Sequence, residues 1–384
     1  MEVWPHERDW ASNLTVLSGD IGTLHNDDDN AYHVISATNV TSATLLDGFT
    51  VVGGNADGMG QHGSGGGLLN ENSDLILRNV VFSGNHADGH GGGMVNMGGG
   101  NPTLIHVAFS GNTAGNEGGG LYAAFPGDVS LMNATFSANS AGSAGGALRC
   151  EMGAGATVVN SIVWGNTPDQ FRQAWLGQIS VSYSDVEGDW PGVSIVDVDP
   201  VFYDADGPDD VLGTPDDDLR LRHSSPVIDK GDNGALRLDG DDLDGDGVVT
   251  ETLPLDLSGR SRLIGFTVAD PVVDMGVYEA NILDVIAEAT ALLAGGTSFR
   301  TEQVQLLPAD TMEQALQNYK DFNEGELFYD FCADYDQIDD KGYCPEDVDG
   351  PMCATRYLMQ LSFFRWLRVG PPMSGRHTAD RSSL

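Results

Sequence analysis

Hydrophobic and polar positions recur along the chain at a fixed step of 27 residues. The phrase FSGN at 82–85 returns at 109–112, and the related phrase FSAN stands at 136–139. Four columns keep this step: Asn85, Asn112, Asn139 and Asn166; Phe82, Phe109 and Phe136; Gly92, Gly119 and Gly146; and Asn79, His106, Asn133 and Asn160. A fixed period of this length indicates a solenoid or another repeat array.

Each repeat contains short apolar runs and no room for a long amphipathic helix. The runs are LILRNVVF at 75–82, LIHVAF at 104–109, LMNATF at 131–136 and ATVVNSIVW at 156–164, separated by Gly, Asn and Ser. This pattern disfavours helical repeats and predicts short strands joined by turns. We therefore expect an all-β solenoid, a parallel β-helix in which equivalent residues of successive coils stack about 4.8 Å apart.

Stacking assigns a role to each column. The Phe residues should fill the interior as one pile of rings and bury apolar area. A buried Asn amide can donate to the Asn of one neighbouring coil and accept from the other, which satisfies polar groups at the turns. The paired Gly residues allow a positive φ at the corner before the next apolar residue.

The repeat motifs FSGN…GGGM, FSGN…GGGL and FSAN…GGAL resemble the FxxN and GGA(I/L/V) repeats of polymorphic outer-membrane proteins. Three later motifs resemble the choice-of-anchor Q region of secreted β-helix proteins: SPVIDKGDN (225–233), DLSGR (256–260) and VDMGVYE (273–279). The resemblance extends over residues 8–280. It implies a right-handed, single-stranded parallel β-helix, and it implies secretion with a surface or adhesin-like role.

The pattern divides the chain into three parts. Residues 1–185 should form the coils, and residues 186–280 a final distorted coil with an acidic, loop-rich cap. Residues 281–384 contain runs with a helical period and should form a mostly helical region of unknown role. Proteins of the type that the chain resembles carry a signal peptide and further coils before the first segment. We therefore expect the coil domain to be N-terminally truncated, with the signal peptide lost through truncation.

The charge balance is strongly acidic, with 57 Asp and Glu against 18 Lys and Arg, for a net charge of −39. Such a surface repels nucleic acid and anionic lipid, and it either stays solvated or binds cations. No apolar run is long enough to predict a transmembrane segment. The four Cys include Cys332, Cys344 and Cys353 near the end of the chain, where one local disulfide is possible.

One acidic loop has the spacing of a calcium site. The segment DDLDGDGVVTET (241–252) places Asp242, Asp244 and Asp246 at alternate positions before Gly247, and Val248 at the position that supplies a backbone carbonyl in EF-hand loops. Leu253 replaces the usual bidentate Glu, so Glu251, Asp239 or Asp256 must substitute for it. We predict a structural Ca²⁺ ion here, and the alternative is a solvated acidic loop. The segments 204–210 and 215–218 form a second, weaker acidic cluster.

The HGGG segment at 90–93 has the composition of an esterase oxyanion hole. The chain contains no G-x-S-x-G nucleophile motif, and the repeat already explains the three Gly residues. One repeat later the position of His90 is taken by Glu117, so the sequence suggests that this His is incidental.

The coils show no clear catalytic pattern. Lyases that act on uronates need cations in their groove, but only Arg78 and Arg149 are basic between residues 9 and 171. Column steps from Glu117 show no second carboxylate on the next coil. The sequence favours a non-catalytic extracellular or cell-surface module, adhesin-like or glycan-contacting, with Tyr122 and Phe125 as exposed aromatic candidates. The alternative is a carbohydrate-active enzyme, a polysaccharide lyase or glycoside hydrolase, on the same scaffold.

Overall fold

The computed structural model describes residues 10, 13–24, 26–222, 224–240, 242–243, 247–263 and 271–280. The chain divides into two compact units, Met1–Ala280 and Asn281–Leu384, and all described residues belong to the first. The predicted helices of residues 281–384 and the predicted disulfide among Cys332, Cys344 and Cys353 lie outside the described residues.

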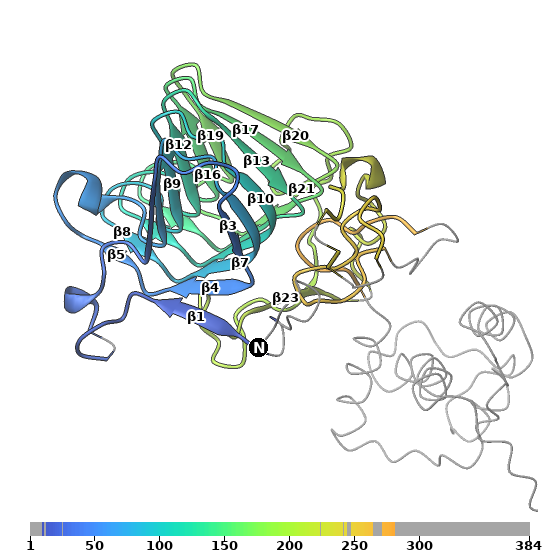
Figure 1. Ribbon diagram of the computed structural model, residues 1–384, viewed down its shortest axis with the longest axis horizontal. Helices are drawn as coiled ribbons and strands as arrows, with labels where there is room; N and C mark the ends of the chain where they lie inside the picture. The colour runs from blue at the N-terminus through green and yellow to red at the C-terminus, as the bar shows by residue number, and fades with distance from the viewer. Residues whose placement is uncertain are drawn as a thin grey trace, which may run out of the picture. The chain divides into compact units, whose positions relative to one another are not determined.

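The described residues form a parallel β-helix of about five turns, which confirms the predicted fold class (Figure 1). Its coils are built from three parallel sheets. Sheet A contains β1 (Thr15–Ser18), β3 (Leu45–Asp47), β4 (Phe49–Val52), β7 (Ile76–Ser83), β10 (Thr103–Ser110), β13 (Asp128–Met132), β14 (Thr135–Ser137), β17 (Gly155–Val159), β18 (Ile162–Trp164), β20 (Gln178–Ser182) and β21 (Asp185–Val186). Sheet B contains β2 (Ile35–Thr38), β6 (Leu68–Glu71), β9 (Met94–Met97), β12 (Leu121–Ala124), β16 (Leu148–Glu151) and β19 (Phe171–Gln173). Sheet C contains β5 (Asn55–Ala56), β8 (His86–Ala87), β11 (Thr113–Ala114) and β15 (Ser140–Ala141).

The remaining elements of the described ranges are short. They include three 3-10 helices, η2 (Asp27–Asp29), η3 (Gly60–Gly63) and η4 (Asn233–Ala235). The strands β22 (Phe202–Asp204) and β23 (Asp218–Leu221) pair antiparallel outside the coils.

The interior is a stack of apolar side chains in the predicted register. Phe82 pairs with Phe109, and Phe109 pairs with Phe136. Their ring centroids lie 5.0 and 4.7 Å apart, and the planes are tilted by only 9° and 7°. All three rings are fully buried, so the period of the sequence directly produces the core.

The buried Asn column forms the predicted amide ladder. Nδ2 of Asn85, Asn112 and Asn139 donates to Oδ1 of the next Asn at 3.0, 2.9 and 2.8 Å. Asn166, the last of the column, donates to Gln170 Oε1 at 2.7 Å. The ladder therefore continues across the coils and ends on a Gln amide.

The corner glycines have two separate tasks. The positive φ belongs to Gly91, Gly118 and Gly145, which precede the Gly92 column that the sequence suggested. At Gly92 a Cβ would lie 2.3 Å from Thr113 O, so that column needs Gly for the close approach of the next coil. The backbone thus requires Gly at consecutive positions for different reasons.

The segment after the coils closes both their end and one side. Trp190 packs edge-on against Phe171 at 5.1 Å, and Val196 bridges to Asp185, so residues 190–196 form the last, distorted coil. The described residues between 200 and 280, which we call the cap, lie along the outer face of sheet A (Figure 1). Apolar side chains of the cap cover outward-facing residues of sheet A such as Ile105 and Ala108.

Candidate functional site

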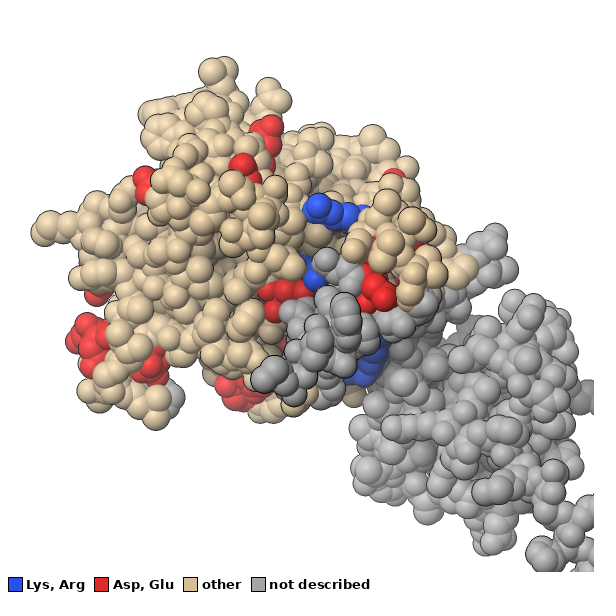
Figure 2. All heavy atoms as spheres, in the orientation of Figure 1, with Lys and Arg blue, Asp and Glu red and all other residues tan. Residues whose placement is uncertain are grey.

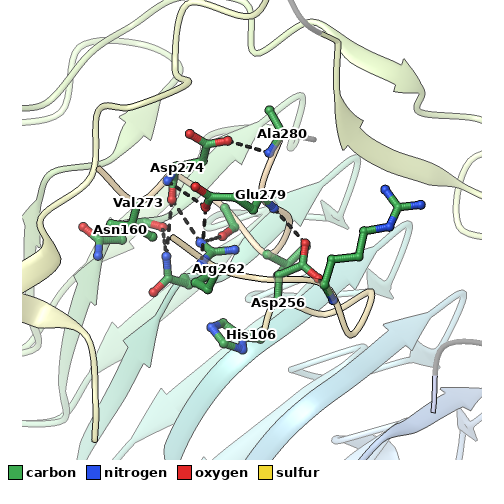
Figure 3. Close-up of polar contacts among 12 residues, drawn as sticks. His106, Asn160, Asp256, Arg262, Val273, Asp274, Glu279 and Ala280 are labelled. Atoms are coloured by element: carbon green, nitrogen blue, oxygen red, sulfur yellow. Dashed lines mark hydrogen bonds and ion pairs between the residues drawn. The ribbon is translucent and has the colours of Figure 1, made fainter. Parts of the chain in front are cut away.

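The three motifs of the cap meet in one buried polar network (Figure 3). Asp229 N donates to Asp274 Oδ1 at 2.6 Å, which joins the first motif to the third. Glu279 N donates to Asp256 Oδ2 at 2.9 Å, which joins the third motif to the second. Asp274 N donates to Glu279 Oε2 at 3.1 Å within the third motif. The acidic residues of these motifs therefore bind backbone N–H groups and fold the cap.

Arg262 is the cationic centre of this network and is fully buried. Its Nη2 donates to Asp274 O at 3.0 Å and to Gly276 O at 2.5 Å, and its Nε lies 3.8 Å from Glu279 Oε2. His106 of the coils lies nearby (Figure 3). Burial, with the positive charges of Arg262 and Arg78, holds the pKa of His106 well below its usual value. His106 is therefore neutral at pH 7.

The network also attaches the cap to the coils. Asn160 Nδ2 donates to Asp232 O at 3.0 Å, and Asp232 N donates to Asn160 Oδ1 at 2.7 Å. Gly276 N donates to Asn160 O at 2.8 Å. Asn160 has φ 51°, as have its column neighbours within a few degrees, and Asn adopts this left-handed conformation readily. The last residue of a turn column thus serves as the docking point, and we assign this network a structural role.

A second polar cluster lies on the outer face of sheet B, and we call it the outer-face cluster. It comprises His90, Glu117, Tyr122, Arg149 and Glu151. Strands β12 and β16 supply the last three residues, whose side chains alternate outward with inward core residues. His90 and Glu117 come from the glycine-rich corners, which fold back over this face and bridge to each other.

The cluster is closely hydrogen-bonded. Tyr122 OH donates to Glu151 Oε1 at 2.6 Å, and Arg149 Nη2 donates to Glu151 Oε2 at 2.8 Å. The same Nη2 lies 3.2 Å from Glu117 Oε1. The ring of His90 stacks on Tyr122 with centroids 4.3 Å apart. Two carboxylates from different columns are therefore brought to a single guanidinium.

The surroundings of Glu151 and His90 shift the pKa of each group and so determine its charge at pH 7. Burial raises the pKa of Glu151, but hydrogen bonds from Tyr122 and Arg149 outweigh it and leave the pKa below its usual value. Burial lowers the pKa of His90, against the opposing effect of Glu117 and Glu151. At pH 7 Glu151 is ionised and His90 is neutral. This arrangement can accept and donate hydrogen bonds, but Glu151 has no proton to give to a leaving group.

Sequence reasoning missed this cluster. The sequence predicts an exposed Tyr122, and this is wrong, because the side chain is only 5% exposed under the folded corner. It also suggests that His90 is incidental, but His90 covers the Tyr122 ring. The column of Glu117 contains His90 and Ala144, so stepping along it never reaches Glu151. The one sequence signal for Glu151 is the alternation of side chains along β16, which places Arg149 and Glu151 on the same outer face.

The glycines of the HGGG segment are engaged by the neighbouring coil. Gly91 N donates to Glu117 O and Gly93 N donates to Gly119 O, both at 3.1 Å. An oxyanion hole needs such N–H groups to point at a ligand. The segment is therefore part of the architecture, as the repeat predicted.

The two basic residues between residues 9 and 171, Arg78 and Arg149, are both buried and paired. Arg78 forms an ion pair with Asp47 at 2.7 Å, and Arg149 pairs with Glu117 and Glu151. Figure 2 shows that most of the coil surface in view carries no charged side chain, with acidic residues in small separate groups. A groove for a polyanionic sugar needs accessible cations, so the geometry of these two arginines argues against a uronate lyase.

The predicted calcium loop is described only in part, because Asp244 and Asp246 lie outside the described residues. Asp242 has φ 53° and its Oδ1 accepts from Gly247 N at 3.0 Å. Val248 is exposed, and Glu251 O accepts from Asp239 N at 2.8 Å. Within the described ranges no group of three or more His, Cys, Asp or Glu is placed to hold a metal.

Asp256, one of the suggested substitute ligands, is occupied by the protein itself. Its Oδ1 accepts from Ser258 N at 2.8 Å, from Ser258 Oγ at 2.7 Å and from Arg260 N at 3.0 Å. Its Oδ2 accepts from Glu279 N. Any Ca²⁺ ion in the 241–252 loop must therefore be bound without Asp256.

Comparison with known proteins gives one partial match. The model of the Chlamydia polymorphic membrane protein repeat matches residues 106–124, which run from β10 to β12 and include one FSGN and one GGGL motif. No curated protein and no solved structure shows a significant match. The predicted similarity of the repeats to polymorphic membrane proteins is confirmed for this segment. The resemblance of residues 225–279 to the choice-of-anchor Q region stays a prediction.

None of the helical segments in the described part of the chain has the length and apolar character needed to cross a bilayer.

Proposed function

We propose that the coils and cap form a non-catalytic extracellular or cell-surface module that contacts glycans or other surface components in the manner of an adhesin. The observation that carries this proposal is the match of residues 106–124 to a repeat of surface-associated outer-membrane proteins. The stacked coils support it, because they provide a rigid body with long lateral faces and little charge on the face seen in Figure 2.

The alternative is a glycoside hydrolase, and the contact of Glu117 and Glu151 with one arginine favours it. A hydrolase pair needs one carboxyl group that donates a proton and a second that stays ionised. Glu151 fits the ionised role because its pKa is lowered. However, Glu151 and Arg149 are largely buried, with side chains only 9% exposed, which leaves little room for a sugar between them.

We also propose a structural Ca²⁺ ion in the 241–252 loop, with Asp242, Asp244 and Asp246 as side-chain ligands. Alternating carboxylates around a glycine turn support this proposal, since hard cations prefer such oxygen ligands.

Binding and degradation assays on the full chain distinguish the two functions. We expect retention of the chain on a glycan array or on cell surfaces, and no release of reducing sugars from a panel of polysaccharides, with or without EDTA. Release of sugars that Glu151→Gln abolishes and that the exposed control Asp57→Asn preserves would replace the module with a hydrolase. A chain that binds neither glycans nor cells would contradict the proposal.

A further inference from the structure

The corner that follows sheet B changes its residues from one end of the coils to the other. Along this corner, the strand register aligns Asn39, Asn72, Gly98, Phe125, Met152 and Trp175. All six have a positive φ, between 48° and 76°. Asn and Gly accept this conformation readily, whereas bulky side chains rarely adopt it. The last three coils therefore hold large apolar residues at a position where the backbone favours Asn or Gly.

These side chains point into solvent. Phe125 is 50% exposed and Trp175 is 73% exposed, and Leu176, also at positive φ, is 87% exposed. Nothing in the core requires a Phe or a Trp at such a position. We call Phe125, Met152, Trp175 and Leu176 the corner ridge. Met152, on the coil between Phe125 and Trp175, is half-buried. Apolar residues at a strained backbone position on three successive coils, with exposed side chains on two of them, indicate a role in contact with a ligand.

A row of polar side chains runs beside this corner, two residues after it at Asp74 and three residues after it at Asn101, Asp128 and Gln178, with Gly155 on the coil of Met152. Asp74 Oδ1 accepts from Asn101 Nδ2 at 3.1 Å, and Asn101 Oδ1 accepts from Asp128 N at 3.0 Å. Asp128 leans over Gly155, where a Cβ would lie 2.2 Å from its Oδ1. Gln178 follows on the last coil and is exposed. The row supplies carboxylate and amide groups next to the aromatic rings.

The charge around the ridge restricts the ligand. The polar row contains no Lys or Arg, and Arg172, three residues before Trp175, is paired with Asp169. Sulfated and uronate-containing sugars would meet the carboxylates of the row, and Arg172, which Asp169 partly neutralises, offsets this repulsion only in part. A sugar without charge presents an apolar C–H face to an aromatic ring and hydroxyl groups to Asp, Asn or Gln.

We propose that the corner ridge and its polar row form the binding site for an uncharged glycan. The inference deepens the proposed function and rests on it. Phe125 and Trp175 are two coils, or about 10 Å, apart, so each can stack on a separate ring of one oligosaccharide. The ridge has only four apolar side chains, which is small for a stable protein–protein interface.

The test uses the full chain and the double variant Phe125→Asn, Trp175→Asn. Asn occupies the same corner in the earlier coils, so the melting temperature should stay the same or rise. We expect hexasaccharides of glucose, mannose or galactose to include a ligand, and its affinity to fall about ten-fold in the variant, the effect of two aromatic contacts. Met59→Ala, which removes an exposed apolar side chain elsewhere, should leave the affinity unchanged.

Four results would overturn the inference. Unchanged affinity in the double variant, or binding restricted to uronate and sulfated hexasaccharides, would refute this site while leaving the surface module intact. A dimer in sedimentation that the variant converts to monomer would assign the ridge to a second copy of the chain. Absence of binding to every glycan and to cells would refute the inference and the proposed function together.

Discussion

Asn85 donates a hydrogen bond from its side-chain amide to that of Asn112 at 3.0 Å, although the two residues are 27 positions apart. Each amide also binds backbone, since Asn112 Nδ2 donates to Phe82 O at 2.9 Å. The buried ladder therefore couples neighbouring coils through both side chains and main chain. It links the repeat of the sequence directly to the stability of the fold.

Replacement of a central ladder residue should be costly. Asn112→Ala removes the acceptor that Asn85 N and Nδ2 share and the Nδ2 donor to Phe82 O, so we expect a loss of about 2–4 kcal/mol in the free energy of unfolding. The matched control is Asn101→Ala, in the exposed ladder with the same step, where water replaces the lost bonds and the loss should stay under about 1 kcal/mol. Urea denaturation measures both, and equal losses would contradict the role of the buried ladder.

The stability of the protein should depend on pH through Asp185. Burial raises the pKa of this carboxyl from 3.8 to about 7; the Val198 N–H opposes the rise, and Asp197, Asp199 and Glu187 add to it. The folded state then keeps a proton that the unfolded state loses near pH 4. The free energy of unfolding should therefore fall as the pH rises from about 4 to about 7.

Asp185→Asn removes this titration and keeps an oxygen to accept from Val198 N. We expect the variant to match the wild type below about pH 4 and to exceed its unfolding free energy by about 2–4 kcal/mol at pH 8. Urea titrations across this pH range measure the difference, with the exposed Asp128→Asn as control. A constant difference at all pH values would contradict the buried, protonated carboxyl.

Removal of Ca²⁺ should lower the melting temperature if the 241–252 loop binds the ion. EDTA should reduce the melting temperature by several degrees, and added Ca²⁺ should restore it, because a ligand that binds only the folded state stabilises it. Asp244→Asn should abolish the EDTA effect, whereas Asp128→Asn, outside the loop, should preserve it. No change with EDTA would remove the Ca²⁺ proposal.

The sequence predicted those features that depend on a constant step. Phe82, Phe109 and Asn112 keep the step of 27, so the period alone identifies their neighbours in the adjacent coils. The sequence did not predict the corner ridge because the number of residues per coil changes there. Phe125 and Met152 are 27 residues apart, but Met152 and Trp175 are separated by 23, so a fixed period does not align all three.

The sequence did not predict the outer-face cluster or the face that the cap covers, for another reason. Periodicity shows which residues stack, but it does not show which loops fold over an outer face. The Glu117 corner and His90 cover Tyr122, and the cap covers Ala108, through contacts that no repeat encodes. The chemistry of these faces follows from tertiary packing, and sequence columns alone do not reveal it.

Cysteine cross-linking tests the stacking of the coils most directly. Thr113 of β11 pairs with Ser140 of β15. Their Cα atoms are therefore about 4.8 Å apart, a separation that suits a disulfide. The experiment uses Thr113→Cys with Ser140→Cys in a chain whose four native cysteines are replaced. After oxidation and digestion, mass spectrometry should find a bond joining positions 113 and 140. The control pair Thr113→Cys with Ser36→Cys, on different sheets, should remain reduced. A missing bond in the first pair, or equal bonding in both pairs, would contradict the stacked coils.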